Sequence, residues 1–406
     1  MGNITETMNA RAAECKDMAE LEAFFSQHED DMVGFDTVMR HLLNTHNLSV
    51  EEFIAMYGRS CRRNIEDWLD GISAPYKRSE YIKIAILLNM SLNEANVFLT
   101  RACGCGRLYP KNIDDAACIH VLIHHLGYNE YLKTRVLMRN EIEEIAYCRT
   151  KDFFPEDYNK ERDALEKDEH YFEKVAELNQ KYFDEEKNIK QRKNRLFTNA
   201  WEKKEKYLRQ TLLANAKQGD ITFVGTEVLM DTLSETTDMV QYVRDNWEAI
   251  LASNYKLLAY IEKLFDKCEL VGTNGKKVNT INALVTYYMD DDVIDDTVGN
   301  KLTTFFSRMR TNCATDIDRN YIILLGILFE LDVEEINTMM DIAHMDYLCA
   351  KNHGEATIIS ALGKGSRDPQ EVMDILSISD YSDYLSVKNL LLKFFSKEDL
   401  EDYGLI

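Results

Sequence analysis

Residues 48–71 read LSVEEFIAMYGRSCRRNIEDWLDG, and this stretch carries the strongest local pattern in the chain. Ser49 can cap a helix, because Glu52 stands at the distance of a capping box. That helix ends at Gly58, which permits a left-handed turn. Ser60 can cap a second helix over the rest of the stretch. The stretch therefore predicts two short helices joined by a tight turn.

Apolar side chains recur through this helix pair at helical spacing. Those predicted to form its core are Phe53, Ile54, Tyr57, Ile65, Trp68 and Leu69. Further helices are expected over 35–46, 76–88 and 92–103, the last capped by Ser91, and a short amphipathic helix is expected at 17–28. The pattern is that of a small, purely helical domain.

Composition extends the all-α expectation to the whole chain. Only 4 prolines occur in 406 residues, which favours long uninterrupted helices. No apolar run approaches the length of a membrane-spanning helix, and the start of the chain does not resemble a secretory signal. The 9 cysteines are odd in number and irregularly spaced. We therefore expect reduced thiols and a cytoplasmic location.

The net charge of −22 argues against a surface that binds nucleic acid all over. The charge is uneven, however. Residues 35–128 carry 10 basic and 10 acidic side chains, whereas 271–406 carry 12 basic and 23 acidic ones. Residues 35–128 are the least acidic part of the chain, so this is where a nucleic-acid site is easiest to place.

Residues 155–215 are highly charged and contain no glycine and only one proline, at the start. Their sparse apolar residues recur at spacings of three, four and seven, which predicts a long, mostly solvated helix or a helical hairpin. A coiled-coil dimer is an open alternative, since the apolar seam is irregular. More helix is expected over 236–267, and Gly272–Gly275 is the clearest turn between domains.

An offset of 241 residues relates 58–102 to 299–343. Eight of the 45 positions are identical, and many others keep their character. The identical pairs are Gly58/Gly299, Arg78/Arg319, Ile82/Ile323, Ile86/Ile327, Leu87/Leu328, Glu94/Glu335, Asn96/Asn337 and Ala102/Ala343. With a one-residue slip, Lys111-Asn112 falls on Lys351-Asn352. We interpret the match as an internal duplication.

Residues 36–128, with the helix pair quoted above at their centre, resemble the lambda-repressor-like (XRE-type) helix-turn-helix domains of bacterial regulators. The resemblance implies that the helix after Gly58 is a recognition helix in the major groove of DNA. The DNA-contacting residues would then be Ser60, Arg62, Arg63 and Asn64 at the start of that helix, with Lys77 and Arg78 on phosphate. The turn is one residue longer than the family pattern, and Glu66, Asp67 and Asp70 add negative charge.

The second copy keeps apolar residues at the positions that pack in the core, but it lacks the basic and amide residues at the positions predicted to contact DNA. Under the offset, Arg62 becomes Thr303, Arg63 becomes Thr304 and Asn64 becomes Phe305, while Lys77 becomes Asp318. The acidic run 289–296 is expected on the helix before the counterpart of the recognition helix, where it would repel phosphate. Phe306 should be buried, and Phe305 should be exposed as an anchor for a protein partner.

Other groups of residues give weaker evidence for a functional site. The Cys103–Cys105 pair with His120 and His124 lacks the usual spacing of a zinc site, so no metal is expected. Gly363–Ser366 lacks the order of a phosphate-binding loop. No nucleophile with a partnered base is visible, and we expect neither catalytic residues nor a cofactor.

The sequence thus predicts two helix-turn-helix-like domains joined by a long charged helical segment. The expected segments are 1–34 (acidic helix), 35–128 (first domain), 129–270 (connector), 271–365 (second domain) and 366–406 (helical tail). The leading hypothesis is a sequence-specific DNA-binding protein, a transcriptional regulator that contacts duplex DNA through the first domain. The alternative is a non-enzymatic adaptor that uses both domains for protein contact. A protein partner or homodimer would bind through the connector and the second domain, and no membrane is involved.

Overall fold

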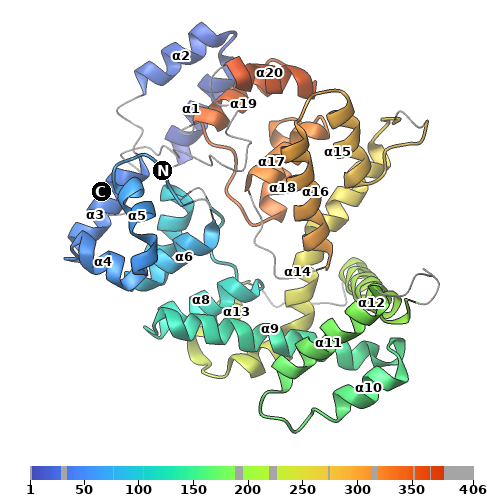
Figure 1. The fold of residues 1–406 in the computed structure, drawn as a ribbon. Coiled ribbons are helices and arrows are strands. Elements are labelled where there is room, and N and C mark those ends of the chain that lie inside the picture. Colours follow the sequence, from blue (N-terminus) through green and yellow to red (C-terminus); the bar gives the residue numbers. More distant parts are fainter. Residues whose placement is uncertain are drawn as a thin grey trace. The chain divides into compact units, whose positions relative to one another are not determined.

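The computed structural model describes residues 2–28, 34–75, 77–103, 105–187, 195–218, 226–272, 275–311, 319–350, 353–365 and 367–378. Within these ranges the protein is all-α, as predicted (Figure 1). Twenty α-helices are described there, and the one β-type contact in the same ranges is an isolated antiparallel bridge between Val271 and Lys277.

The described residues fall into two compact units. The first comprises those of Met1–Tyr109, Cys118–Tyr128 and Leu257–Ile406, and the second comprises those of Pro110–Ala117 and Asn129–Lys256. The α-helices are α1 (Gly2–Glu14), α2 (Met18–Gln27), α3 (Phe35–Thr45), α4 (Val50–Tyr57), α5 (Arg62–Leu69), α6 (Arg78–Leu87), α7 (Leu92–Val97), α8 (Ile113–Ile123), α9 (Tyr128–Thr150), α10 (Glu156–Asp163), α11 (Tyr171–Lys187), α12 (Leu196–Gln218), α13 (Thr226–Glu235), α14 (Met239–Lys267), α15 (Ile281–Asp290), α16 (Asp296–Thr311), α17 (Arg319–Leu328), α18 (Val333–Ile342), α19 (His353–Gly363) and α20 (Pro369–Ile378). Short turns of other helix types are η2 (Arg59–Cys61), η3 (Phe98–Ala102) and η4 (Lys151–Phe153).

The helix pair α4–α5 has the core that the sequence predicts. All six predicted core residues are buried, and the Trp68 ring meets the Tyr57 ring edge-on at a centroid distance of 5.5 Å. The capping box of Ser49 and Glu52 is present at the start of α4. The prediction that Ser60 caps α5 is wrong, because η2 intervenes and the N-cap of α5 is Cys61, which makes no side-chain cap.

Equivalent hydrogen bonds occur in the two predicted copies. Arg78 Nη2 donates to the carbonyls of Gly106 and Arg107, at 3.0 and 3.2 Å. Its counterpart Arg319 donates through Nη1 and Nη2 to the carbonyls that close the equivalent loop, those of Asp346 and Tyr347, at 2.6 and 2.9 Å. Both loops follow the second helix of a pair, α6–α7 in the first copy and α17–α18 in the second.

A second pair of hydrogen bonds repeats in the same way. The Asn96 Oδ1 accepts from the Leu108 amide at 2.8 Å, and the Asn337 Oδ1 accepts from the Leu348 amide at 2.8 Å. Capping boxes open both α7 and α18. Each helix pair and the loop after it therefore share these contacts, and the duplication itself stays a prediction.

The similarity between the two copies does not extend through the turn between α4 and α5. Gly58 lies at a turn with φ of 133°, whereas Gly299 lies inside the continuous helix α16. A Cβ at Gly299 would lie 2.3 Å from the Met289 sulfur, so this glycine permits close packing of α16 against α15. The predicted equivalence of the two glycines is wrong, since one ends a helix and the other packs within one. The acidic run 289–296 covers the end of α15 and the turn into α16.

The N-terminal helix packs against the second copy. The Asn9 side chain donates to the Leu348 carbonyl at 2.9 Å and accepts from the Ala350 amide at 2.7 Å. A Cβ at Gly363 would lie 2.7 Å from the Ala13 carbonyl oxygen, which brings α1 and α19 into close contact. Helix α20 also packs on α19 (Figure 1). The five predicted segment boundaries stay a prediction.

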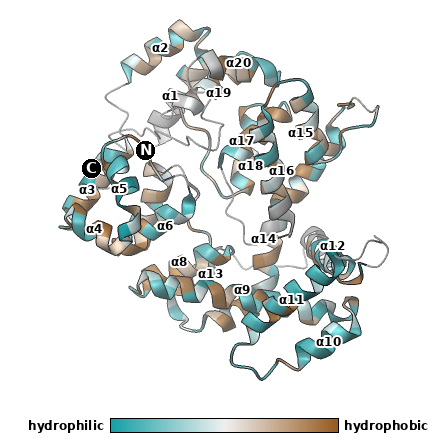
Figure 2. Cartoon of the chain, in the orientation of Figure 1, coloured by the Kyte–Doolittle hydropathy of each residue, from teal (hydrophilic) through white to brown (hydrophobic). Residues whose placement is uncertain are grey.

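The second unit contains the charged segment 155–215. The prediction of a single long helix over this segment is wrong, because α10 ends at Asp163 and α11 begins at Tyr171. Helix α11 packs on α12, and Figure 2 shows hydrophilic residues along α11 with a few apolar ones between them. Those apolar residues join a cluster formed by Tyr147, Phe154, Tyr158, Leu178, Phe197 and Ala200. A coiled-coil dimer stays a prediction.

Candidate nucleic-acid interface

The turn between α4 and α5 is fixed from both sides. Gly58 has φ of 133°, a region that side chains rarely adopt, and nothing within 4 Å would meet an added Cβ. The glycine is therefore required by the backbone and not by space. Lys83 on α6 donates from Nζ to the Tyr57 carbonyl at 2.5 Å and lies 3.9 Å from the centre of the Tyr57 ring. A cation at the C-terminus of α4 is favourable for its dipole.

The start of α5 presents a group of polar side chains to solvent. Ser60, Arg62, Arg63 and Asn64 are all exposed, as the sequence predicts. Arg59, in η2 just before them, is exposed as well. Three arginines and an amide thus stand together on a helix end that projects from a rigid pair.

Arg62 is engaged by carboxylates on both sides. Its Nη1 and Nη2 donate to the two oxygens of Glu51, at 2.7 and 2.5 Å, and Nη1 also lies 3.3 Å from Glu66. The hydrogen bond from Arg62 is the largest cause that lowers the pKa of Glu51, while the same bond raises the pKa of Arg62. The side chain of Arg62 is still 46% exposed, so a competing anion can reach it.

Lys77 and Arg78, at the start of α6, have different environments. Lys77 is the exposed N-cap residue of α6, where a phosphate contact is sterically open. Arg78 is half-buried and directs its guanidinium to the Gly106 and Arg107 carbonyls. Because Arg319 makes the same contacts in the second copy, we assign Arg78 to holding its loop and leave it out of the interface.

The acidic residues of α5 are partly neutralised. Glu66 lies beside Arg62, and Asp70 Oδ1 lies 3.3 Å from Arg40 Nη2. Asp67 is half-buried. Each of these ion pairs also engages an arginine, so the net charge of this face stays as the sequence count gives it.

Sequence reasoning missed three residues of this site. Glu51 and Lys83 act across the turn, at sequence separations of 11 and 26 from their partners Arg62 and Tyr57. Such separations carry no periodic signal. Arg59 could have been found, since it is a basic residue in the turn of the quoted stretch.

The described residues of the second copy show no comparable surface. The prediction that Phe305 is exposed is wrong: it is 7% exposed and its ring lies 4.9 Å from both Phe306 and Tyr321. The physical reason is that α16 continues without a turn, which carries Phe305 into the core. Phe306 is buried as predicted. Asp318, the counterpart of Lys77, lies outside the described residues.

The threonines that replace the two arginines bond to their own helix. Thr303 and Thr304 both donate to the Asn300 carbonyl, at 3.0 and 2.7 Å. Such bonds occupy a hydroxyl within its own helix. The second copy therefore lacks a polar reading edge at these positions.

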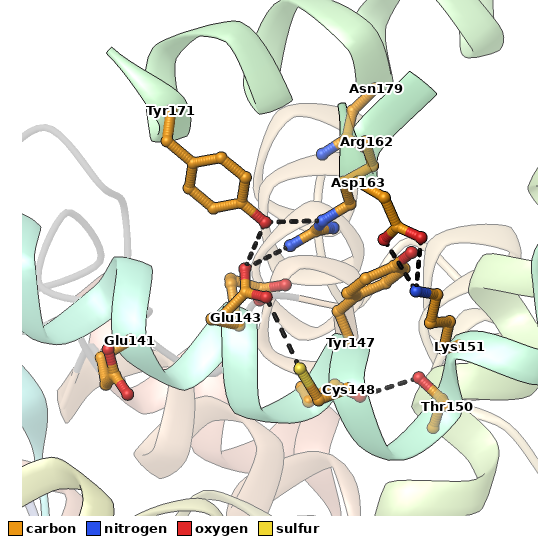
Figure 3. A network of polar contacts seen from close by, with 12 residues as sticks. Glu141, Glu143, Tyr147, Cys148, Thr150, Lys151, Arg162, Asp163, Tyr171 and Asn179 are labelled. Atoms are coloured by element: carbon orange, nitrogen blue, oxygen red, sulfur yellow. Dashed lines mark hydrogen bonds and ion pairs between the residues drawn. The ribbon is translucent and has the colours of Figure 1, made fainter. Parts of the chain in front are cut away.

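A buried polar network lies in the second unit and was not predicted (Figure 3). Arg162 Nη2 donates to Glu144 at 2.7 Å, and the Tyr171 hydroxyl donates to the same oxygen at 2.8 Å. The Arg162 guanidinium lies 3.6 Å from the centre of the Tyr147 ring. Each charge has a partner, so the network stabilises the packing of α9 against α10 and α11.

Neither a metal site nor a membrane span is found where the structure can be described. Among those residues no group of three or more His, Cys, Asp or Glu side chains could hold a metal ion. His120 and His124 lie in and just after α8, with ring centroids 4.6 Å apart. In the same residues no helix combines the length and the apolar character needed to cross a membrane.

Comparisons with protein-family models, with curated proteins and with solved structures find no match to this chain. The assignment of function therefore depends on the site itself.

Proposed function

We propose that the first copy binds duplex DNA through the start of α5 and that the chain is a sequence-specific DNA-binding protein, a transcriptional regulator without catalytic activity. The observation that supports it most is the exposed set Arg59, Arg62, Arg63 and Asn64 on one helix end. Arginine pairs with guanine O6 and N7, and asparagine pairs with adenine N6 and N7, in the major groove.

The rigid mounting of α5 supports the same proposal. Base readout needs side chains held in a defined place, because a misplaced donor loses its hydrogen bond. The Trp68 and Tyr57 rings and the Lys83 bond to the Tyr57 carbonyl hold α5 against α4 and α6. Lys77 stands exposed at the start of α6, where the proposal places a contact with phosphate.

In the proposed interface, Glu51 competes with DNA for Arg62, because the two residues form an ion pair. A phosphate or a guanine must displace Glu51 before Arg62 can contact it. Arg63 is exposed and forms no ion pair with a described residue, and it is therefore the residue on which affinity should depend most. The expected loss for Arg63→Ala is about ten- to a hundredfold, the value of a bidentate base contact.

The same ion pair is the observation that favours the alternative, a protein-docking role. A surface on which Glu51, Arg62 and Glu66 alternate in charge resembles a polar protein interface as much as a DNA-binding one. In that case neither the wild-type chain nor the variants described below would bind duplex DNA.

The test is fluorescence anisotropy with the full chain and a labelled library of duplexes at low salt. Arg63→Ala and Asn64→Ala should weaken binding, while Thr304→Ala, at the equivalent position of the second copy, should leave it unchanged. Circular dichroism should show equal stability for all three variants, because these side chains are exposed. Failure of the wild-type chain to bind any duplex would reject the proposal and favour protein docking.

A further inference from the structure

A groove with an apolar floor lies beside the helix pair α17–α18. Its volume is about 460 Å³, which is in the range of ligand-binding sites. The end of α14, the turn between α17 and α18 and the start of α18 line it. Its apolar lining residues are Leu264, Leu270, Leu328, Phe329 and Leu331. Leu270 and Phe329 are only half-buried, so the described residues leave part of the floor uncovered.

The groove is preformed. The Phe329 ring meets the Phe265 ring of α14 with centroids 4.8 Å apart. The Tyr288 hydroxyl donates to Glu330 Oε1 at 3.3 Å, which holds the turn between α17 and α18. A surface that is already ordered loses little conformational freedom when a partner binds.

The rim of the groove carries more negative than positive charge. Its charged lining residues are Glu269, Glu330, Glu335, Lys267 and Arg367. Arg367 Nη2 lies 2.7 Å from Asp332 Oδ2, and its Nη1 lies 3.5 Å from Glu335 Oε2. With Asp332 included, four carboxylates therefore surround two cations. The groove is complementary to an occupant that combines apolar side chains with positive charge.

The C-terminal part of the chain contains a segment of this chemistry. Residues 379–406 lie outside the described part of the chain, after the end of α20. Within them, residues 386–397 read SVKNLLLKFFSK, with three lysines and no acidic residue. The spacing of one helix face is kept by Val387, Leu390, Leu391, Phe394 and Phe395. Lys388 and Lys397 fall at the two edges of that face.

The chain is long enough to bring this segment to the groove. Arg367 lines the groove, and the ten residues of α20 that follow it span about 15 Å. Residues 379–386 can span up to about 26 Å when extended. The distance covered by α20 can therefore be retraced before Val387.

We propose that the groove binds residues 386–397 of the same chain as an amphipathic helix, with the apolar face on Phe329 and the lysines at the acidic rim. Helices bound in apolar grooves use anchors at positions i, i+3, i+4 and i+7, which is the spacing of Val387, Leu390, Leu391 and Phe394. This interaction does not depend on DNA binding.

Cys268 lines the groove as a half-buried free thiol and can report its occupant. Full chains that carry Leu391→Cys or Asn389→Cys are oxidised with diamide, and the disulfides of Cys268 are mapped by mass spectrometry. Residue 391 lies on the apolar face and residue 389 on the opposite one, while both share one tether and hence one effective concentration. The disulfide with Cys268 should form about tenfold more in the Leu391→Cys chain, about 1.4 kcal/mol in favour of the docked face.

Charge reversal tests the role of the acidic rim. Lys388→Glu with Lys397→Glu, added to the Leu391→Cys chain, should lower the disulfide yield severalfold at low salt. Lys388→Arg with Lys397→Arg keeps the charge and should keep the yield.

Equal yields for Leu391→Cys and Asn389→Cys would overturn the proposal, because a tether without docking treats both faces alike. Disulfides that join two chains, seen as a covalent dimer, would assign the groove to the tail of a second copy and would also overturn it. A yield that does not respond to charge reversal would remove the complementarity on which the choice of occupant rests.

Discussion

Replacement of Arg319 by alanine should destabilise the second copy more than any single change among the exposed residues at the start of α5 destabilises the first copy. Arg319 and Glu355 are an almost fully buried ion pair, with side chains 8% and 6% exposed and Nε 2.7 Å from Oε1. Arg319 also donates to two loop carbonyls, and Glu355 also accepts from the Cys349 amide at 2.7 Å. Arg319→Ala would leave Glu355 charged and buried.

The magnitude follows from that unpaired charge. Breaking a buried pair by removing one partner costs about 3–5 kcal/mol. Urea unfolding of the full chain, followed by circular dichroism, measures the loss. Glu355→Gln is the matched control: it keeps the packing, removes the negative charge and should restore part of the stability when combined with Arg319→Ala.

The equivalent change in the first copy sharpens the test. Arg78 donates to two loop carbonyls and is half-buried, whereas Arg319 is almost fully buried, so Arg78→Ala should cost less than Arg319→Ala. Equal and negligible losses for Arg78→Ala and Arg319→Ala would show that the two arginines do not hold their loops, and the structural equivalence of the copies would be refuted.

Three further predictions concern packing and charge. Gly326→Ala should cost about 1–3 kcal/mol of stability, since the added Cβ would lie 2.7 Å from Ile336. Combining it with Ile336→Ala should show favourable coupling, because the first copy has Ala85 and Ala95 at these two positions. Additive losses in the double-mutant cycle would contradict this. Burial raises the pKa of Glu205 to about 7, so its stabilising contribution is complete below about pH 4.5 and is lost as the pH rises through 7. Glu205→Gln should therefore stabilise the chain by up to about 3 kcal/mol at pH 8 and leave it almost unchanged at pH 5, and a stability difference that does not depend on pH would reject this. Trp68→Ala should cost about 3–5 kcal/mol through the loss of a buried ring, and an unchanged urea midpoint would show that the α4–α5 core is misassigned.

Local chemistry explains what could be predicted from the sequence. The six core residues of α4 and α5 are set by helical periodicity, and the capping boxes at Ser49 and Ser91 are set by residues three positions apart. The similarity between 58–102 and 299–343 can be seen in the sequence because residues such as Arg78 and Asn96 recur at one constant offset. The helix and capping signals lie within one or two helices, whereas this similarity needs the whole stretch.

The errors arose where a contact or a backbone turn spans elements. The 241-residue offset predicts an exposed Phe305 because it carries the turn of the first copy into α16, which has none. The spacing predicts a cap at Ser60 because it contains no signal for η2 between Gly58 and α5. The pairing of Arg62 with Glu51 and the bonding of Arg78 to a loop need the folded chain, so neither could be read from spacing.

Glu51→Gln offers the most direct test of the central claim that the start of α5 contacts DNA. The variant removes the carboxylate that holds Arg62 and leaves an amide of the same shape. The measurement is the affinity of wild type and variant for duplex DNA at a series of salt concentrations. We predict a linear fall of log affinity with log salt for both, and tighter binding by Glu51→Gln at every concentration, because the released arginine can reach phosphate or base. Equal affinities for the two proteins, or no binding at low salt, would contradict the claim.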